Sequence, residues 1–420
     1  MRSIRELYFQ EGYKTTQCYY DNNTHITTDN LDGLSIRLIE RNTKKLISTK
    51  LNNIGNEEKF IKYLEEQKRS IHLIDTIRDC SQKQIVSKND IILFNEIINV
   101  CAKYKKYLKI TMENLNLSKV VTILDKKNEK NDNFTTLHIS DNENKYSSVY
   151  FSLVSEKNIE KVKDEIKEIL PYIGIQKIEP IKSGEYDLVF KSPLGGILFH
   201  EVFGHQFELS KSKTPISPVN FPNNYKIARK NLTIKDVAFN NILTEKFDDE
   251  GNVKLETILI KNGMINSPLT DLKTLMEYPQ YYITGNARRE SHIYYPEPRM
   301  YCTIVENGKT RIENMLNNIE HGFYIESISE AYLDHLSGIV RCYINKAFII
   351  KNGKINNEPI KFIIEDNAMK IIDNIEYISN DFSINSGCCN SNSGRLYIEY
   401  GAPSIQISKI NIKEGYVYGN

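Results

Sequence analysis

The sequence predicts an α+β protein in two parts: a mixed α/β N-terminal domain over residues 1–180 and a β-rich C-terminal domain over residues 181–420. Two observations lead to this prediction. Helical and strand-like apolar spacing alternate in the first part, whereas tight-turn dipeptides that follow alternating or β-branched runs mark the second. The length of 420 residues is enough for two domains, and 40% hydrophobic with 26% charged residues is typical of a globular protein.

The N-terminal domain is expected to open with two strands. Asp32-Gly33 predicts a turn between extended segments at residues 24–28 and 35–39. Three further strands are expected, at residues 120–124, 135–139 and 147–153. The charged stretch at residues 126–133, between the first two of these, is expected to form a loop.

Three helices are expected among these strands. Apolar residues recur at helical spacing over residues 56–78 and again after Asn89 or Asp90, either of which can cap the second helix. The third helix is predicted over residues 156–170. It is expected to stop at Pro171, because proline cannot donate a helical hydrogen bond.

Three Asn-Gly dipeptides predict tight turns in the C-terminal domain. Each follows a run with strand character. The turns are Asn262-Gly263, Asn307-Gly308 and Asn352-Gly353, and the runs are residues 255–260, 301–305 and 343–350. This pattern predicts several short strands joined by hairpins.

Charge and composition exclude several classes of function. The chain has 55 Lys and Arg against 54 Asp and Glu, so its formal net charge of +1 gives no field that would attract nucleic acid or an anionic membrane. No apolar run approaches the roughly 20 residues that cross a bilayer, and the N-terminus lacks the apolar region of a secretory signal. The seven cysteines suggest no disulfide framework. A cytoplasmic protein is therefore expected.

The segment from residue 194 to 208 contains His200, Glu201 and His205 in a His-Glu-x-x-x-His pattern. Neutral imidazole is a common zinc ligand, and two histidines on one short helix supply two ligands. A glutamate beside the first histidine can take a proton from a zinc-bound water. The alternative is a buried amphipathic helix whose histidines are satisfied in the core, but an unpartnered Glu201 would be costly there.

The five-residue spacing between the histidines is unfavourable on an ideal α-helix, because it places them about 140° apart. A π-type turn would bring them together, since it closes residue i to residue i+5. Gly204, directly before His205, can ease such a distortion. The sequence therefore predicts a widened turn or a helix end at this point.

A catalytic zinc site needs a third protein ligand and an open position for water. The residues alone leave the third ligand open among several side chains that carry suitable atoms. These are Glu208, Cys388, Cys389, His292, His321 and His335.

Four stretches together resemble the TldD/PmbA family of metallopeptidases, on its catalytic TldD side. The resemblance runs from about residue 183 to the end and is weaker in the N-terminal domain. The stretches are Gly195-Gly-Ile-Leu-Phe-His-Glu-Val-Phe-Gly-His; Asp248-Asp-Glu-Gly with Ile258-Leu-Ile-Lys-Asn-Gly; Thr284-Gly-Asn-Ala-Arg-Arg-Glu-Ser with Tyr295-Pro-Glu-Pro-Arg-Met; and Ile375-Glu-Tyr-Ile-Ser-Asn-Asp-Phe to Ser386-Gly-Cys-Cys with Gly401-Ala-Pro-Ser-Ile.

The resemblance implies one zinc ion per chain, held by His200, His205 and Cys389. The two histidines would lie on a helix of the C-terminal domain, and the cysteine on a distant segment near the C-terminus. Cys388 falls on the family's variable position, and the doublet leaves open which sulfur binds. Glu201 would act as general base and then as proton donor. The oxyanion would be stabilised by a residue of the third stretch: His292, Arg288, Arg289, Tyr294 or Tyr295.

The family's substrates are extended or unfolded peptides, including leader segments of modified peptides. Such a peptide can add as a strand to a sheet edge. Two segments depart from the family, residues 210–240 and residues 327–334, and the latter is expected to border the substrate path.

The resemblance also implies a dimer, either of two copies or with a TldE/PmbA-like paralogue that lacks the zinc residues. Nucleic acid and membrane are not expected as partners. The alternative function is a regulatory or scaffolding subunit with a structural zinc ion and little activity of its own. Such a site would need a fourth ligand, Glu208 or Cys388, and would not need Glu201.

Overall fold

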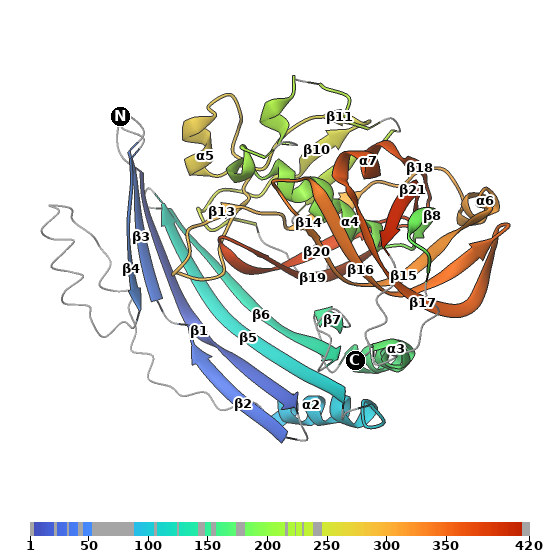
Figure 1. Ribbon diagram of the computed structural model, residues 1–420. Helices are drawn as coiled ribbons and strands as arrows, with labels where there is room; N and C mark the ends of the chain where they lie inside the picture. Colours follow the sequence, from blue (N-terminus) through green and yellow to red (C-terminus); the bar gives the residue numbers. More distant parts are fainter. Residues whose placement is uncertain are drawn as a thin grey trace, which may run out of the picture.

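The computed structural model describes most of the chain (Figure 1). The described residues are 4–20, 23–31, 33–40, 45–52, 88–104, 107–123, 126–141, 148–152, 157–173, 181–214, 217–222, 224–228, 231–237 and 246–413. Among them, no helix is long and apolar enough to cross a membrane. The helix expected over residues 56–78 lies outside the described residues.

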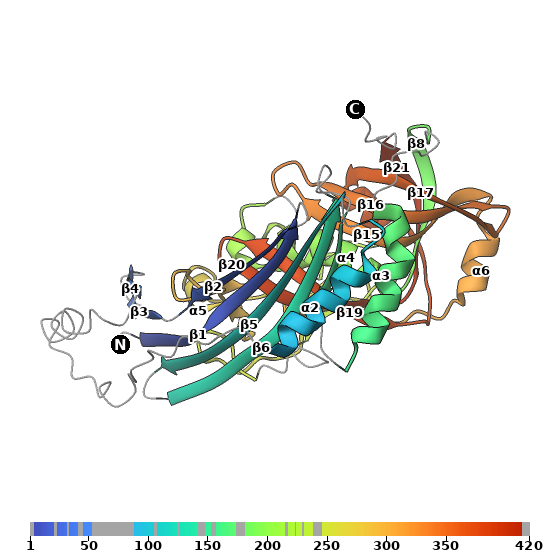
Figure 2. The same ribbon diagram turned by 90° about the horizontal axis from the view of Figure 1, so that it is seen from below.

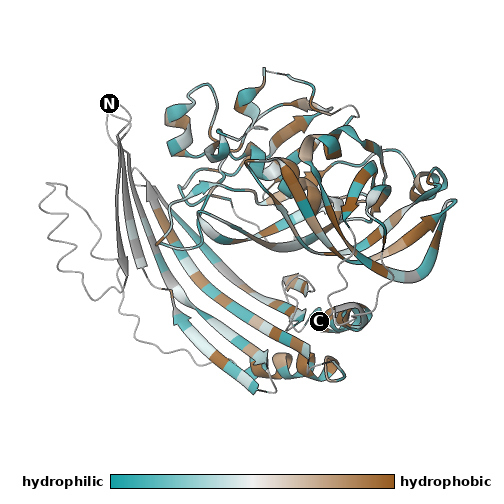
Figure 3. Ribbon diagram, in the orientation of Figure 1, coloured by the Kyte–Doolittle hydropathy of each residue, from teal (hydrophilic) through white to brown (hydrophobic). Residues whose placement is uncertain are grey.

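The first part of the chain forms one antiparallel seven-stranded sheet in the order β4-β3-β1-β5-β6-β7, with β2 also paired to β1. Its strands are β1 (Ile4–Tyr20), β2 (Asn23–Asn30), β3 (Gly33–Glu40), β4 (Lys45–Asn52), β5 (Leu108–Ile123), β6 (Lys126–Asp141) and β7 (Ser148–Ser152). Hydrophobic and hydrophilic residues alternate along much of β5 (Figure 3), as expected of a strand with one buried face, whereas the first half of β6 is hydrophilic throughout.

Helices α2 (Lys88–Val100) and α3 (Ile159–Ile173) contact each other beside this sheet (Figure 2). Their apolar residues share one core with the sheet, which includes Phe94, Ile97 and Ile166 from the helices and Ile110 and Leu137 from the strands. The repeat of apolar residues every three or four positions produces this packing, because it places them on one helix face.

Several sequence-based expectations for this part need correction. Residues 126–133 form strand rather than a charged loop, because they pair along their whole length with β5. Segments 24–28 and 35–39 are strands as expected, and each pairs with β1 and not with the other. Asp32 of the turn predicted between them lies outside the described residues. Asn89 and Asp90 lie inside α2, and α3 runs past Pro171 to Ile173, since a proline near the end costs few helical hydrogen bonds.

The second part contains two six-stranded sheets and one two-stranded sheet, in the orders β11-β10-β9-β14-β20-β19, β17-β16-β15-β8-β21-β18 and β12-β13. The strands are β8 (Gly184–Phe190), β9 (Ile234–Val237), β10 (Thr257–Lys261), β11 (Met264–Ile265), β12 (Ala287–Arg288), β13 (Glu297–Pro298), β14 (Cys302–Val305), β15 (His321–Leu333), β16 (Ile339–Lys351), β17 (Lys354–Asn367), β18 (Ile375–Ile378), β19 (Ser383–Ser391), β20 (Gly394–Ala402) and β21 (Ile405–Lys413). The helices are α4 (Gly195–Phe199), α5 (Leu272–Glu277), α6 (Ile312–Asn317) and α7 (Ala368–Asp373).

Helix α4 and the turn after it lie between the two six-stranded sheets. They contact β14 and β20 of one sheet and β15 of the other. The apolar residues of this segment, among them Leu198, Phe199 and Phe203, belong to the main core together with Phe190 and Ile405 of the neighbouring strands. The segment with the His-Glu-x-x-x-His pattern is therefore fixed on both sides by sheet.

Two of the three predicted tight turns are confirmed. Asn262-Gly263 and Asn352-Gly353 have positive φ at both residues and join β10 to β11 and β16 to β17, as in type I′ hairpins. The tight turn predicted at Asn307-Gly308 is not formed. There Gly308 N–H donates to Ser379 O at 2.8 Å, and the chain continues into α6. Strand β14 instead pairs with β9 and, in parallel, with β20.

The first sheet docks against the second part through partly buried ion pairs. Lys130 Nζ lies 2.7 Å from Asp249 Oδ1, and Arg395 Nη1 lies 2.6 Å from Glu113 Oε2. All described strands of the first sheet precede residue 153, and all strands of the other sheets follow residue 183. The domain boundary at residue 180 itself stays a prediction.

Candidate metal centre

The predicted widened turn is confirmed between the two histidines. After α4, residues His200–Gly204 form a π-helical turn in which His205 N–H donates to His200 O, and His205–Phe207 continue as a 3₁₀ turn. Gly204 is packed closely, since a Cβ on it would lie 1.8 Å from Met300 Sδ. The turn rotates both imidazoles toward the same point, which an ideal α-helix could not do.

Three side chains converge at that point. His200, His205 and Cys389 are all buried, and their candidate ligand atoms all lie within 4.8 Å of one another. Cys389 comes from β19, and its Sγ lies 3.1 Å from His205 Nε2. Two imidazoles and a thiol at this spacing form a donor set that suits zinc.

Acceptors behind the two imidazoles set their tautomers. His200 Nδ1 lies 3.2 Å from Thr303 Oγ1, whose hydroxyl donates to Met300 Sδ and so accepts from the ring. His205 Nδ1 lies 3.1 Å from Glu208 Oε1, a carboxylate that only accepts when it is ionised. Both rings therefore carry a proton on Nδ1 and turn Nε2 toward the point of convergence, as metal-bound histidines do.

A further observation indicates that His200, His205 and Cys389 suit a metal ion. His200 Nε2 is buried and has no hydrogen-bond partner. A buried ring nitrogen without a partner is costly, whereas a coordinated cation would satisfy it. A zinc ion held by His200, His205 and Cys389 would retain an open position for a water or substrate.

The charges around this point favour a thiolate. Burial acts to raise the pKa of Cys389, but His205 and Arg299 together lower it well below its ordinary value. Burial acts to lower the pKa of His205, but Cys389, Glu208 and Glu201 raise it well above its ordinary value. A proton shared between imidazole and thiolate occupies the position that a metal ion would take, so binding of the ion would release it.

Glu201 lies beside this group, with Oε1 3.9 Å from His205 Nε2. Burial raises the pKa of Glu201 above its ordinary value, against the lowering effect of the two histidines. Its carboxylate faces the same cavity as the three convergent side chains. A base of raised pKa at this position is suited to accept a proton from an attacking water.

The cavity has a volume of about 960 Å³ and is bounded by both parts of the chain. Strand β15 lines one wall through Ser327–Leu333, and β19 lines another through Asn385–Ser391. The first part contributes β7 and α3, including Tyr150 and Glu165. Most of the segment at residues 327–334, which departs from the family pattern, thus borders the cavity, and its place beside the substrate path stays a prediction.

The other proposed third ligands lie in different positions. Glu208 faces Nδ1 of His205, on the side away from Cys389. Cys388 Sγ lies 2.8 Å from Tyr150 OH. His335 lines the cavity, but its ring contacts Gln206. His321 packs against Tyr186 and Phe323. His292 is buried beside Gln10.

None of the five residues expected to stabilise an oxyanion lines the described cavity. Arg288 donates to the carbonyls of Met300 and Tyr397, and Arg289 donates to Ser35 and lies over the ring of Tyr8. His292 N–H donates to Gln10, and Tyr294 N–H to Ser291. Tyr295 is 45% exposed. Arg289 and His292 therefore link the two parts of the chain, whereas Arg288 packs within the second part.

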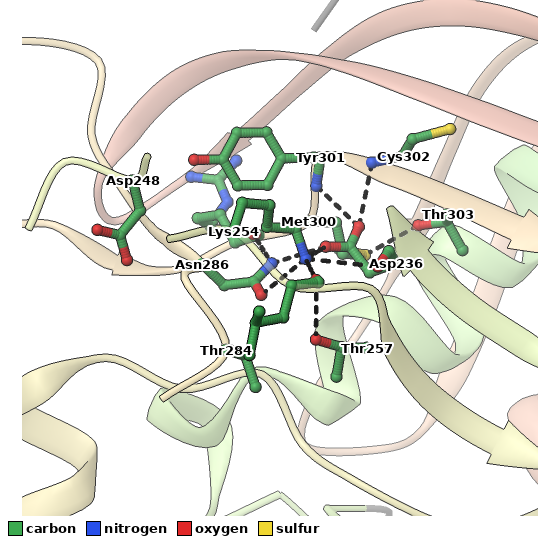
Figure 4. Close-up of polar contacts among 12 residues, drawn as sticks. Asp236, Asp248, Lys254, Thr257, Thr284, Asn286, Met300, Tyr301, Cys302 and Thr303 are labelled. Carbon is green, nitrogen blue, oxygen red and sulfur yellow. Dashed lines mark hydrogen bonds and ion pairs between the residues drawn. The ribbon is translucent and has the colours of Figure 1, made fainter. Parts of the chain in front are cut away.

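A buried ion pair supports the segment that carries Thr303 (Figure 4). Asp236 Oδ2 lies 2.9 Å from Lys254 Nζ, and Oδ1 accepts from the N–H groups of Tyr301 at 2.8 Å and Cys302 at 3.1 Å. Both charged side chains are at most 1% exposed. Sequence reasoning missed Thr303 and this pair, because they act through contacts between segments far apart in the chain.

Comparison with protein-family models gives a match to the PmbA/TldA metallopeptidase C-terminal domain over residues 183–414. Among curated relatives, a metalloprotease TldD homologue of Buchnera aphidicola is 28% identical over 234 residues, which is 55% of this chain and 48% of the relative. A zinc metalloprotease TldD homologue of Saccharolobus solfataricus is 29% identical over 245 residues, or 56% and 53%. The match thus spans about half the length of these curated relatives.

Two solved structures share the fold along almost the whole chain. TldE from Thermococcus kodakarensis has a TM-score of 0.70 at 15% identity, covering 97% of this chain and 96% of its own. A proposed modulator of a DNA gyrase from Thermotoga maritima has a TM-score of 0.70 at 17% identity, covering 98% and 96%. At this level of identity, the likeness concerns the fold alone.

Proposed function

Because the chain belongs to the TldD/PmbA family of metallopeptidases, we propose that it is a zinc-dependent peptidase with one zinc ion per chain. One observation carries the proposal: His200 Nε2, His205 Nε2 and Cys389 Sγ converge beside Glu201 at the wall of a large cavity. Each imidazole is held by an acceptor on its far nitrogen, which orients Nε2 toward the point of convergence.

Zinc, when bound, would polarise the substrate carbonyl and lower the pKa of an attacking water. Glu201 takes the proton of that water on its carboxylate and then passes it to the nitrogen of the leaving amine. Burial raises the pKa of Glu201, which makes its carboxylate a stronger base than that of a solvent-exposed glutamate. The buried walls around it limit access of bulk water to the reacting atoms.

The substrates are proposed to be extended or unfolded peptides, in leader-peptide processing or in peptide degradation. Strand β8 pairs with β15 only over Gly322–Ile325, while β16 covers the other edge as far as Leu333. Along Ser327–Leu333, no other described strand pairs with the edge of β15, and these residues line the cavity. An extended peptide can add there as a strand, bound mainly through its backbone.

The protein is proposed to act in the cytoplasm as a dimer, either of two copies or with a TldE/PmbA-like paralogue. The described cysteines are free thiols, which suits a reducing compartment. The fold shared with TldE over almost the whole chain suits pairing with a related subunit. Closed two-fold dimers are also the commonest soluble oligomers.

A regulatory or scaffolding subunit with structural zinc is less well supported. Such a site would need a fourth protein ligand. Glu208 is engaged by His205 Nδ1, and Cys388 by Tyr150. Among the described residues, only His200, His205 and Cys389 group as metal ligands.

The substitution Glu201→Gln separates these two functions. The amide keeps the shape of the side chain but cannot accept the proton, so cleavage of an unfolded test peptide should fall by at least a hundredfold. Zinc content, measured by atomic absorption, should stay at the wild-type level, because Glu201 is not a proposed ligand. An active wild type with an equally active variant would show that Glu201 is not the base.

A further inference from the structure

Arg299 is a buried cation directly behind the metal centre. Its side chain is 1% exposed, and it follows β13 in the chain. Nη2 donates to Cys389 O at 2.8 Å, and Nη1 donates to Ser393 Oγ at 2.9 Å and Gly394 O at 3.1 Å. The guanidinium therefore holds the end of β19, its turn and the start of β20 together.

The same guanidinium also reaches the helical half of the centre. Arg299 Nε lies 3.6 Å from Glu208 Oε1, the oxygen that accepts from His205 Nδ1. One planar group thus joins the backbone of the Cys389 ligand to the carboxylate that orients His205. The three elements are far apart in sequence, and no direct backbone pairing joins β19 to the helical segment.

We propose that Arg299 is a positioning residue that fixes the distance between His205 and Cys389 and so prepares the site for a metal ion. The proposal rests on the proposed metal centre. An arginine suits this task because its fork of donors can meet two carbonyls and a carboxylate at once, whereas lysine presents one compact charge.

The alternative is that Arg299 has a purely structural role, in which its charge only compensates the buried carboxylate of Glu208. Two variants separate the roles. Arg299→Lys keeps the charge but loses the fork. The double variant Arg299→Met with Glu208→Gln removes both charges, so it leaves no uncompensated buried ion, and the glutamine oxygen can still accept from His205. Arg341→Lys is the matched control, because Arg341 is exposed and pairs with Glu365 away from the centre.

The experiment titrates each purified full-length chain, stripped of metal, with Co²⁺. It follows the affinity and the sulfur-to-cobalt charge-transfer absorption, and circular dichroism checks the fold. We expect Arg299→Lys and the double variant to bind Co²⁺ about tenfold more weakly or worse, with a weakened charge-transfer band. Arg341→Lys should match the wild type.

The proposal would be overturned if folded Arg299→Lys bound Co²⁺ with wild-type affinity and an unchanged charge-transfer band. It would also be overturned if the double variant regained both the wild-type affinity and the wild-type band. Failure of the proposed function looks different, because the wild type would then bind no Co²⁺ or show no sulfur absorption at all. If Arg299→Lys unfolds, the double variant decides. A folded double variant with weakened binding supports positioning, and one that binds normally reduces Arg299 to charge compensation.

Discussion

At the scale of single residues, the centre depends on side chains that are not themselves ligands. Thr303 accepts from His200 Nδ1, and Glu208 accepts from His205 Nδ1. These two acceptors hold the Nδ1 protons and orient the rings so that Nε2 of each ring faces the point of convergence. Packing and hydrogen bonds thus fix the orientation of both histidines.

The substitution Thr303→Val tests this arrangement, because valine has nearly the same shape but lacks the hydroxyl. His200 Nδ1 then loses its acceptor, and zinc affinity should fall by roughly 10-fold to 100-fold. Competition with a chromophoric chelator measures the affinity. Wild-type affinity in a folded variant would show that Thr303 does not orient the ring.

At the scale of elements, the π-helical turn is useful only because α4 lies tightly between two sheets. Gly196 lies directly against the backbone of β20, since a Cβ on it would lie 2.9 Å from Gly401 N and 3.2 Å from Gly401 C. Both atoms belong to the backbone of β20 and cannot move aside cheaply. The glycine therefore sets how deeply the helix sits, and with it the height of His200 and His205 above Cys389.

The substitution Gly196→Ala should destabilise the protein by about 1–3 kcal/mol, as overpacking of a tight core does. The melting temperature should fall and zinc should bind more weakly. Gly184→Ala is the matched control, because its Cβ would meet only Tyr186 side-chain atoms, the nearest at 3.5 Å. Equal melting temperatures for the two variants would contradict this account of α4.

At the scale of the whole molecule, the first sheet completes the cavity and is held to the second part by a buried ion pair. Burial acts to raise the pKa of Asp249, but Lys130, Lys119 and Arg289 lower it well below its ordinary value. A carboxyl whose pKa is lowered on folding stabilises the protein above its unfolded pKa of about 3.9. That stabilisation disappears as the pH falls through the folded pKa.

The substitution Asp249→Asn should therefore cost about 3 kcal/mol of unfolding free energy at pH 7, since it leaves buried cations without their partner. The difference from wild type should shrink as the pH is lowered below about 4. Urea denaturation at pH 7 and pH 3 measures both values. Asp164→Asn, at an exposed pair with Lys167, should change little, and a pH-independent cost for Asp249→Asn would refute the ionic origin.

The sequence could predict the parts of this structure that follow from local geometry. The five-residue spacing of His200 and His205 requires a widened turn, and two Asn-Gly turns form the expected hairpins. Strand pairing is not local, which is why residues 126–133 were mistaken for a loop.

Most of the site lies beyond the reach of spacing rules. Cys389 is 184 residues from His205, so only the family resemblance indicated it. Thr303 and Arg299 become visible only when distant strands are brought together. Of the five oxyanion candidates, Arg288, Arg289 and His292 are buried in packing contacts, and none of the five lines the described cavity.

The most direct test compares zinc content and cleavage of an unfolded peptide in the wild type and in Cys389→Ala, with Cys388→Ala as the matched control. We predict about one zinc ion per chain and cleavage in the wild type and in Cys388→Ala, and loss of both in Cys389→Ala. A wild type that binds no zinc, or a Cys389→Ala variant that retains zinc and activity, would contradict the proposed metal centre.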